Sequence, residues 1–232
     1  MTEKVETSRI DIAAVRNFTT EQKLLIMKVV LYCISVLHEH GIVHADIKPD
    51  NILLKHTGNG IYTAKIIDFD SGFLEKYAPK PDEELEGDMV YLAPETLRFM
   101  MGEEVRLNRK VDIYALGMLF HQYFCGRVPG FDTSKYDYLF EAILDDAPLR
   151  ISDAVPENIR PIIVRMLKKD PGQRPQASQI LKYLQNGKET PKITVKPPVI
   201  KPIDISEPGR TTEHKSGSDG GSGFFKRPGD LL

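Results

Sequence analysis

The segment Lys110–Cys125 (KVDIYALGMLFHQYFC) carries apolar side chains on nearly every face when it is drawn as a helix. A helix at a protein surface keeps one polar face, whereas a helix that is apolar all round is enclosed by other elements. The sequence therefore predicts a fold built around one buried central helix. Asp112 lies within this segment, and a buried carboxylate needs hydrogen-bond donors around it. We expect Asp112 to bind other parts of the chain rather than to be an exposed acid.

Helical spacing and capping signals predict further helices along the chain. Thr19 and Gln22 have the spacing of a capping box, in which each side chain binds the backbone N–H of the other residue, and Gly41 is a natural helix stop. Pro94 suits the first turn of a helix, where its missing N–H removes no helical bond. The predicted helices cover residues 20–40, 93–99, 110–125, 137–145, 156–168 and 176–184.

Short β-rich segments lie between the first two predicted helices. The apolar runs Ile42–Val43 and Ile52–Leu54 look like strands on either side of a polar loop, and Tyr62–Phe69 is a further β-rich run. Gly58–Gly60 is a turn sequence, so the third run is expected to pair back on the second. Asp70–Glu86 has no periodicity and is predicted to be a long loop. The chain is therefore expected to be mainly α (α+β), with two small hairpins followed by a run of helices.

Composition and charge exclude several classes of protein. The chain has 232 residues and a formal net charge of −2, which argues against a broad nucleic-acid-binding surface. Its longest apolar stretch, Leu24–Leu37, is interrupted by Lys28 and is shorter than the roughly 20 residues of a membrane span. Cys33 and Cys125 each lie in an apolar run, so buried free thiols are expected rather than a disulfide. We expect a cytoplasmic protein with no nucleic-acid or membrane partner.

The composition changes at about Gly187. Prolines cluster in KITVKPPVIKP and are followed by SGSDGGSG, a pattern that is typical of flexible linkers. The predicted domains are therefore a folded unit, residues 1–187, and a flexible tail or linker, residues 188–232. PPVIKP is also compatible with a polyproline-type ligand, but a solvated tether is the preferred interpretation.

Candidate chemistry gathers in the polar loop, residues 44–51 (HADIKPDN), and in the segment IIDFD that follows it. Asp46, Lys48 and Asn51 lie in the loop, and Asp68 ends the apolar strand that comes next. Carboxylate and carboxamide oxygens are hard ligands of the kind that Mg²⁺ prefers, a carboxylate can deprotonate a hydroxyl, and an ammonium group offsets phosphate charge. These residue types together suit phosphoryl transfer.

Five segments resemble the motifs of eukaryotic-type protein kinases, in the order in which the kinases carry them. HADIKPDN resembles the catalytic loop, and IIDFD resembles the D-F-G segment. GDMVYLAPE resembles the end of the activation segment, KVDIYALGMLF the central helix, and DPGQRP a late segment that carries an arginine. The resemblance spans roughly residues 19–184. It implies a protein-kinase-like C-terminal lobe, which is a helical bundle with small β-hairpins at the face of the ATP cleft.

The resemblance implies a role for each matching position. Asp46 would be the catalytic base, and Lys48 would contact the γ-phosphate of ATP. Asn51 and Asp68 would hold Mg²⁺, so that ATP and Mg²⁺ are the implied cofactors. Asp112 would brace the backbone of the catalytic loop. A lysine in this loop context is typical of Ser/Thr kinases rather than of tyrosine kinases.

Further positions have both a structural and a functional interpretation. The resemblance implies an ion pair between Glu95 and Arg174, and the alternative is two solvated surface charges. The spacing of His38, His40 and His44 permits a metal site. The kinase motif instead implies that His44 is structural.

Three positions depart from the kinase pattern. Ala45 replaces the arginine that reads a phosphorylated activation segment, Asp70 replaces a glycine, and Asp88 replaces a threonine beside the base and the lysine. Nothing before His44 resembles the glycine-rich loop or the strand lysine with which an N-terminal lobe completes the ATP site. We therefore expect the 232-residue chain to lack that lobe and to be nearly inactive by itself.

The predicted function is a Ser/Thr protein kinase that transfers the γ-phosphate of ATP to protein hydroxyls when an N-terminal lobe is supplied. The alternatives are a non-catalytic scaffold derived from a kinase and, less well supported, a small-molecule phosphotransferase. A partner, either an N-terminal lobe or another protein, is expected to cover the cleft face. Residues 75–88 carry six acidic residues against two lysines, so the substrate is expected to be basic near its acceptor. The alternative is that residues 75–88 form a solvated loop and do not attract the substrate.

Overall fold

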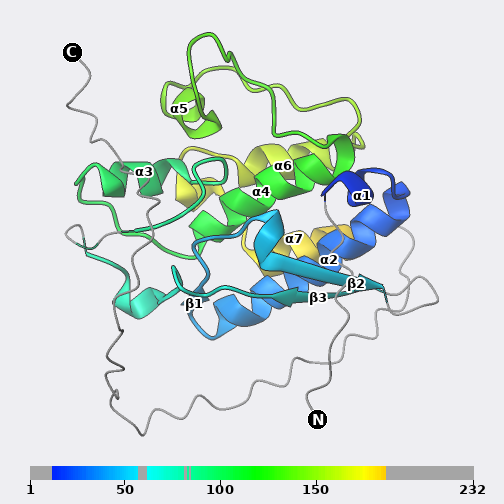
Figure 1. Cartoon of the computed structure of the whole chain (residues 1–232), viewed down its shortest axis with the longest axis horizontal. Coiled ribbons are helices and arrows are strands. Elements are labelled where there is room, and N and C mark those ends of the chain that lie inside the picture. The colour runs from blue at the N-terminus through cyan, green and yellow to red at the C-terminus, as the bar shows by residue number, and fades with distance from the viewer. Residues whose placement is uncertain (1–11, 57–61, 81–82, 84, 187–232) are drawn as a thin grey trace, which may run out of the picture. The chain divides into compact units, whose positions relative to one another are not determined.

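The computed structural model describes residues 12–56, 62–80, 83 and 85–186 of the chain, and the predicted tail and the Gly58–Gly60 turn lie outside them. In Figure 1 the β2–β3 hairpin runs along α2, which also packs against α7. The described helices are α1 (Ile12–Arg16), α2 (Thr20–Glu39), α3 (Pro94–Met100), α4 (Lys110–Cys125), α5 (Leu139–Leu144), α6 (Arg160–Met166) and α7 (Ala177–Gln185). The strands and 3₁₀ turns are β1 (Ile42–Val43), η1 (Pro49–Asn51), β2 (Ile52–His56), β3 (Tyr62–Ile66), β4 (Phe73–Leu74), η2 (Glu75–Tyr77) and η3 (Pro171–Gln173).

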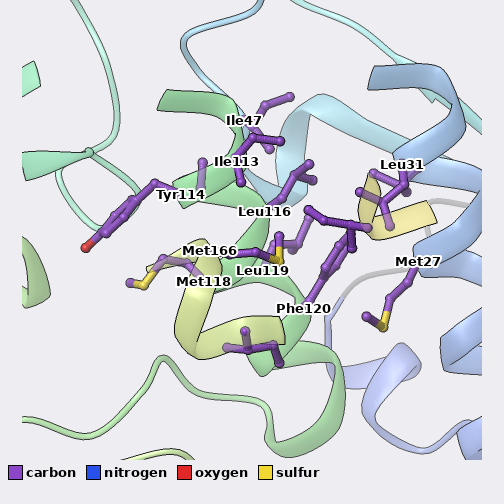
Figure 2. Packing of buried hydrophobic residues seen from close by; sticks show 14 of the residues in the cluster. Met27, Leu31, Ile47, Ile113, Tyr114, Leu116, Met118, Leu119, Phe120 and Met166 are labelled. Carbon is purple, nitrogen blue, oxygen red and sulfur yellow. The ribbon is translucent and has the colours of Figure 1, made fainter. Parts of the chain in front are cut away.

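Helix α4 is the buried central helix that its composition predicts, and its bounds agree with the prediction. Every residue from Val111 to Phe124 is buried. Figure 2 shows Phe120 of α4 in one cluster with Met27 and Leu31 of α2 and Met166 of α6. Because α4 meets apolar neighbours on several sides, it forms the centre of the hydrophobic core.

Helices α4 and α6 approach each other closely at Gly117. A Cβ atom added to Gly117 would lie 3.0 Å from Cβ of Met166 and 3.1 Å from Cδ2 of Leu167. These distances are shorter than ordinary van der Waals contacts between carbon atoms, which are about 3.5–4.0 Å. The absence of a side chain at Gly117 therefore permits this packing.

Helix α2 begins and ends at the predicted signals. The N–H of Gln22 donates to the Thr19 hydroxyl (3.3 Å), and the N–H of Thr19 donates to Oε1 of Gln22 (2.9 Å). Gly41 follows the helix with a φ of +72°, a left-handed conformation that glycine adopts without a steric cost. The capping box and the helix stop are both confirmed.

Helices α5 and α6 are shorter than predicted, and α1 was not predicted. Pro161 occupies the first turn of α6, where a missing N–H is tolerated, so α6 begins at Arg160 and not at Pro156. The Glu141 carboxylate accepts hydrogen bonds from the backbone N–H groups of Asp137 and Tyr138, which marks the start of α5. Helix α1 has only five residues, too few for a periodic pattern to form.

The strands confirm one predicted hairpin and correct the other. Strand β2 pairs with β3 as expected, but β3 ends at Ile66 rather than at Phe69. Strand β1 pairs with β4, in the register Ile42 to Leu74 and Val43 to Phe73, so the segment predicted as an uninterrupted loop contains a strand. A strand of two residues has no periodicity, and a partner about 30 residues away gives no local turn signal.

Both cysteines are free, as predicted, but each is half-buried rather than buried. The Cys33 thiol lies 3.8 Å from the carbonyl oxygen of Ala64, between α2 and β3.

In the part of the chain that the structure describes, no helix has the length and apolarity that crossing a bilayer requires.

A buried ion pair joins the start of α3 to the segment before α7. The Arg174 guanidinium donates to both oxygens of Glu95, at 2.6 and 2.7 Å, and both side chains are almost completely buried. Arg174 also donates to the carbonyl oxygens of Lys168 and Lys110 and lies over the ring of Tyr114. The expected Glu95–Arg174 pair is therefore confirmed, and solvated surface charges are excluded.

Glu95→Ala is expected to lower the free energy of unfolding by about 3–5 kcal/mol, because it leaves a buried guanidinium without its carboxylate. The Arg98–Glu103 pair is a matched control, since its side chains are 47% and 45% exposed. Glu103→Ala is expected to cost less than about 1 kcal/mol. Urea unfolding of the variants measures both values, and equal losses would contradict the prediction.

Candidate active site

The polar loop, residues 44–51, connects β1 to β2 and lies beside the end of β3. The β2–β3 hairpin is extended by one further hydrogen bond, from the N–H of Ile67 to the carbonyl oxygen of Asn51 (3.0 Å). Asp68 is the next residue after Ile67. The hairpin therefore brings Asp68 to the loop that carries the other three predicted site residues.

Three donors converge on the Asp46 carboxylate. Oδ2 accepts hydrogen bonds from Nζ of Lys48 (2.6 Å) and from Nδ2 of Asn51 (2.8 Å), and Oδ1 accepts a longer bond from the N–H of Asp88 (3.3 Å). Nδ2 of Asn51 also donates to the carbonyl oxygen of Asp46 (2.8 Å). The Asp46 side chain is 10% exposed. The carboxylate is thus held in one orientation while part of it still reaches solvent.

The Lys48 ammonium lies among several carboxylates. Its hydrogen bond to Asp46 raises the pKa of Lys48 above its ordinary value, partial burial opposes this, and the charges of Asp88 and Asp68 add to the rise. Lys48 is therefore positively charged at neutral pH. The site combines a fixed cation with a fixed carboxylate, which suits it to hold an anionic group beside a proton acceptor.

The buried Asp112 carboxylate fixes the backbone at the start of the loop. Oδ2 accepts hydrogen bonds from the N–H of His44 (3.0 Å) and from Nε2 of His38 (2.9 Å), and Oδ1 accepts one from the N–H of Ala45 (2.8 Å). Asp112 is 1% exposed. Ala45 has a φ of +64°, which is strained for a residue other than glycine, and the bond to Asp112 holds it there. The predicted bracing role of Asp112 is confirmed.

The three histidines of the loop region have separate partners. His44 is buried, accepts a hydrogen bond at Nδ1 from the N–H of Asp46 (3.3 Å), and donates from Nε2 to the carbonyl oxygen of Ile67 (3.0 Å). His40 donates from Nδ1 to the carbonyl oxygen of Val36, and His38 binds Asp112. The alternative of a shared histidine metal site is therefore wrong, and His44 is structural, as expected.

Asn51 and Asp68 supply oxygen atoms of the kind that Mg²⁺ prefers. Because Nδ2 of Asn51 is engaged with Asp46, the carboxamide oxygen is the atom that a cation would use. Asp68 is exposed and has a φ of +63°. The described residues contain no cluster of three or more His, Cys, Asp or Glu that could enclose a metal. One carboxylate and one carboxamide fit Mg²⁺, which commonly takes its other ligands from water and phosphate.

Comparison with known proteins shows which family the chain belongs to. Residues 2–184 match a family model described as the protein kinase domain. The chain belongs to the protein kinase family. It is 30% identical over 190 residues to calcium-dependent protein kinase 8 of Arabidopsis thaliana, and the matching region covers 79% of this chain and 34% of that protein. It is 32% identical over 193 residues to serine/threonine-protein kinase PAK 4 of Homo sapiens, and the matching region covers 81% of this chain and 30% of that protein. The chain thus spans about a third of the length of these relatives.

The activation segment of this kinase domain, residues 68–95, carries two of the three departures. Asp70 is exposed. Asp88 donates its N–H to Asp46, and its Oδ1 accepts a hydrogen bond from the N–H of Val90 (2.9 Å). The side chain of Asp88 therefore stabilises the local turn, while its backbone contacts the candidate base.

Two contacts of the activation segment were not predicted from the sequence. The Tyr91 hydroxyl donates to Oε1 of Gln122 on α4 (2.7 Å), and burial raises the pKa of Tyr91 to about 12. The Glu75 carboxylate binds Arg109, which immediately precedes α4. Each pair is more than 30 residues apart in sequence, and no spacing rule connects such partners.

Asp112→Asn is expected to loosen the catalytic loop, because it removes the charge and replaces one acceptor oxygen with a donor. Hydrogen exchange at the amides of His44 and Ala45 should become at least about tenfold faster, with a loss of about 2–3 kcal/mol in unfolding free energy. Asp137→Asn, at an exposed acid before α5, is the matched control. Unchanged exchange at His44 and Ala45 in the Asp112 variant would contradict the bracing role.

Proposed function

We propose that this kinase domain transfers the γ-phosphate of ATP to the hydroxyl of serine or threonine in protein substrates, with Mg²⁺ as cofactor. One observation carries the proposal. The Asp46 carboxylate is bound by Lys48 and Asn51 in a loop whose backbone is bonded to buried Asp112. A proton acceptor and a cation fixed together are what positioning and charge stabilisation in phosphoryl transfer require.

Asp46 would act as the base. Among the described residues its Oδ1 receives one hydrogen bond, a long one of 3.3 Å, so this oxygen is the one that the acceptor hydroxyl would approach. The carboxylate orients the hydroxyl and accepts its proton as the hydroxyl oxygen forms a bond to phosphorus. Asn51 keeps the carboxylate from rotating, because its amide nitrogen binds both Oδ2 and the backbone of Asp46.

Lys48 would contact the transferred phosphoryl group, and Asn51 and Asp68 would hold Mg²⁺. When bound, the metal neutralises charge on the phosphate oxygens. The raised pKa of Lys48 keeps its ammonium charged beside the acceptor. The name of the relative PAK 4, a serine/threonine-protein kinase, and the lysine of the loop both favour serine and threonine acceptors over tyrosine.

A basic protein substrate is the partner that the local charge favours. Glu86 and Glu83 are exposed in the activation segment, and Asp88 contacts the base. Glu75 does not contribute to this field, because Arg109 neutralises it. Asp82 and Glu84 lie outside the described residues. Acidic side chains near the acceptor site would concentrate basic segments there.

A partner would also cover an apolar part of the cleft face. Three apolar side chains in one short stretch of the activation segment are exposed: Phe69 by 41%, Leu74 by 42% and Tyr77 by 69%. We propose that an ATP-binding lobe covers this stretch, since exposed apolar patches commonly mark interaction sites. The free thiols suit a reducing compartment such as the cytoplasm.

Asp46→Asn is expected to lower kcat by about 10²–10⁴-fold, because the change is nearly isosteric but removes the base. The assay measures phosphate transfer to a protein substrate, in a kinase in which an ATP-binding lobe precedes this chain. Asp137→Asn should retain full activity in the same assay. Retained turnover in the Asp46 variant would reject the role of Asp46, and an inactive wild type with an intact fold would favour the scaffold alternative.

Peptides with lysine or arginine beside the acceptor are expected to react at least about tenfold faster than matched acidic peptides, through charge attraction to the activation segment. Glu83→Gln combined with Glu86→Gln should reduce this preference. Raising the salt concentration should reduce it as well, because salt screens exposed charges over roughly 8–10 Å. A preference that neither change affects would support the alternative of a solvated loop without a docking role.

A further inference from the structure

The Glu75 carboxylate forms a dense set of bonds with one arginine. Oε1 accepts a hydrogen bond from the backbone N–H of Arg109 (3.1 Å), and Oε2 accepts bonds from Nε (2.8 Å) and Nη2 of the same residue. A guanidinium that binds a carboxylate through two nitrogen atoms fixes direction as well as distance. The additional bond from the backbone N–H of Arg109 also fixes the Glu75 carboxylate against the main chain at the start of α4.

The surroundings of this pair keep Glu75 ionised. Lys76, Arg106 and Lys110 line the same surface hollow. The hydrogen bond from Arg109 lowers the pKa of Glu75 below its ordinary value, against an opposing effect of burial. The side chains of Arg109 and Glu75 are 32% and 23% exposed, so the pair is shielded from much of the solvent. Glu75 is therefore ionised at neutral pH, and its charge is paired with that of Arg109.

Glu75 also closes a ring of contacts around the catalytic loop. Its N–H donates to the carbonyl oxygen of Gly41 (2.8 Å), directly before β1, and it follows β4, which pairs with β1. Strand β1 leads into the catalytic loop, whose backbone binds Asp112. Asp112 lies three residues after Arg109 at the start of α4. Strand β4 therefore cannot move away from α4 unless the Glu75–Arg109 pair breaks.

We infer that Glu75 and Arg109 are positioning residues, which hold the activation segment beside the catalytic loop without phosphorylation. This inference rests on the proposed kinase function for its catalytic consequence, but its structural part does not. A phosphoryl group orders a segment by pairing with an arginine. Ala45 occupies the loop position at which kinases carry the arginine for that phosphoryl group. The Glu75 carboxylate instead pairs with Arg109. Phosphatase treatment should consequently leave activity unchanged.

The structural part is tested in the 232-residue chain by hydrogen exchange. Glu75→Gln keeps the shape of the side chain and removes the charge. Exchange in residues 73–80 is expected to become at least about tenfold faster, the effect of losing bonds to a charged group. Exchange in α4 from Leu116 to Phe124 should not change. Glu104→Gln, at an exposed glutamate between α3 and α4, is the matched control and should exchange as the wild type does.

The charge-exchanged variant, Glu75→Arg with Arg109→Glu, separates the ion pair from a general loss of stability. It should restore at least half of the lost protection in residues 73–80. If Glu75→Gln exchanges as Glu104→Gln does, or if exchange rises equally in α4, the anchoring role is rejected. Failure of the double variant to restore protection also rejects it.

The catalytic part of the inference is tested in the kinase in which an ATP-binding lobe precedes this chain. Glu75→Gln should lower kcat about tenfold and leave the KM for ATP unchanged, since the pair positions the acceptor side of the site. The double variant should recover most of kcat. If kcat does not change, or if the KM for ATP rises instead, the positioning role is rejected. An inactive wild type with an intact fold would reject the proposed function separately, while altered exchange in Glu75→Gln would still support the anchor.

Discussion

The Asp112 carboxylate accepts hydrogen bonds from two backbone N–H groups of the catalytic loop and from a histidine of α2. A buried carboxylate is stable only when its donors are in place, because an unpaired charge in the core costs several kilocalories per mole. Folding of the core therefore also fixes the backbone at the start of the loop. The central helix supplies the hydrophobic surface that α2 and α6 cover, and the same helix carries the carboxylate that shapes the loop.

Features decided by neighbouring residues could be predicted from the sequence. The caps of α2 and the bounds of α4 follow from side chains within a few positions, and the β2–β3 hairpin follows from two β-rich runs close together. The bond between Asp112 and the loop was also predictable, although its partners lie far apart. An acid in an apolar helix must find donors, and the kinase motifs indicate which ones.

Features decided by distant side chains could not be predicted in the same way. The β1–β4 pairing involves two residues on each side, and the Glu75–Arg109 pair joins segments with no shared pattern. By sequence, Glu75 adds to the negative charge of the activation segment, but in the structure Arg109 neutralises that charge. Charge summed along a chain overestimates the local field whenever an acid has a partner from elsewhere.

Gly117 shows how the same core restricts the sequences that this domain can adopt. Along the rest of α4, one apolar side chain can replace another of similar volume at modest cost. At Gly117 a methyl group would fit only if Met166 and Leu167 moved by a few tenths of an ångström. Substitution at this position is thus limited by volume rather than by polarity. A repacked core designed on this backbone would have to keep Gly117 or make room for a side chain at Met166 and Leu167.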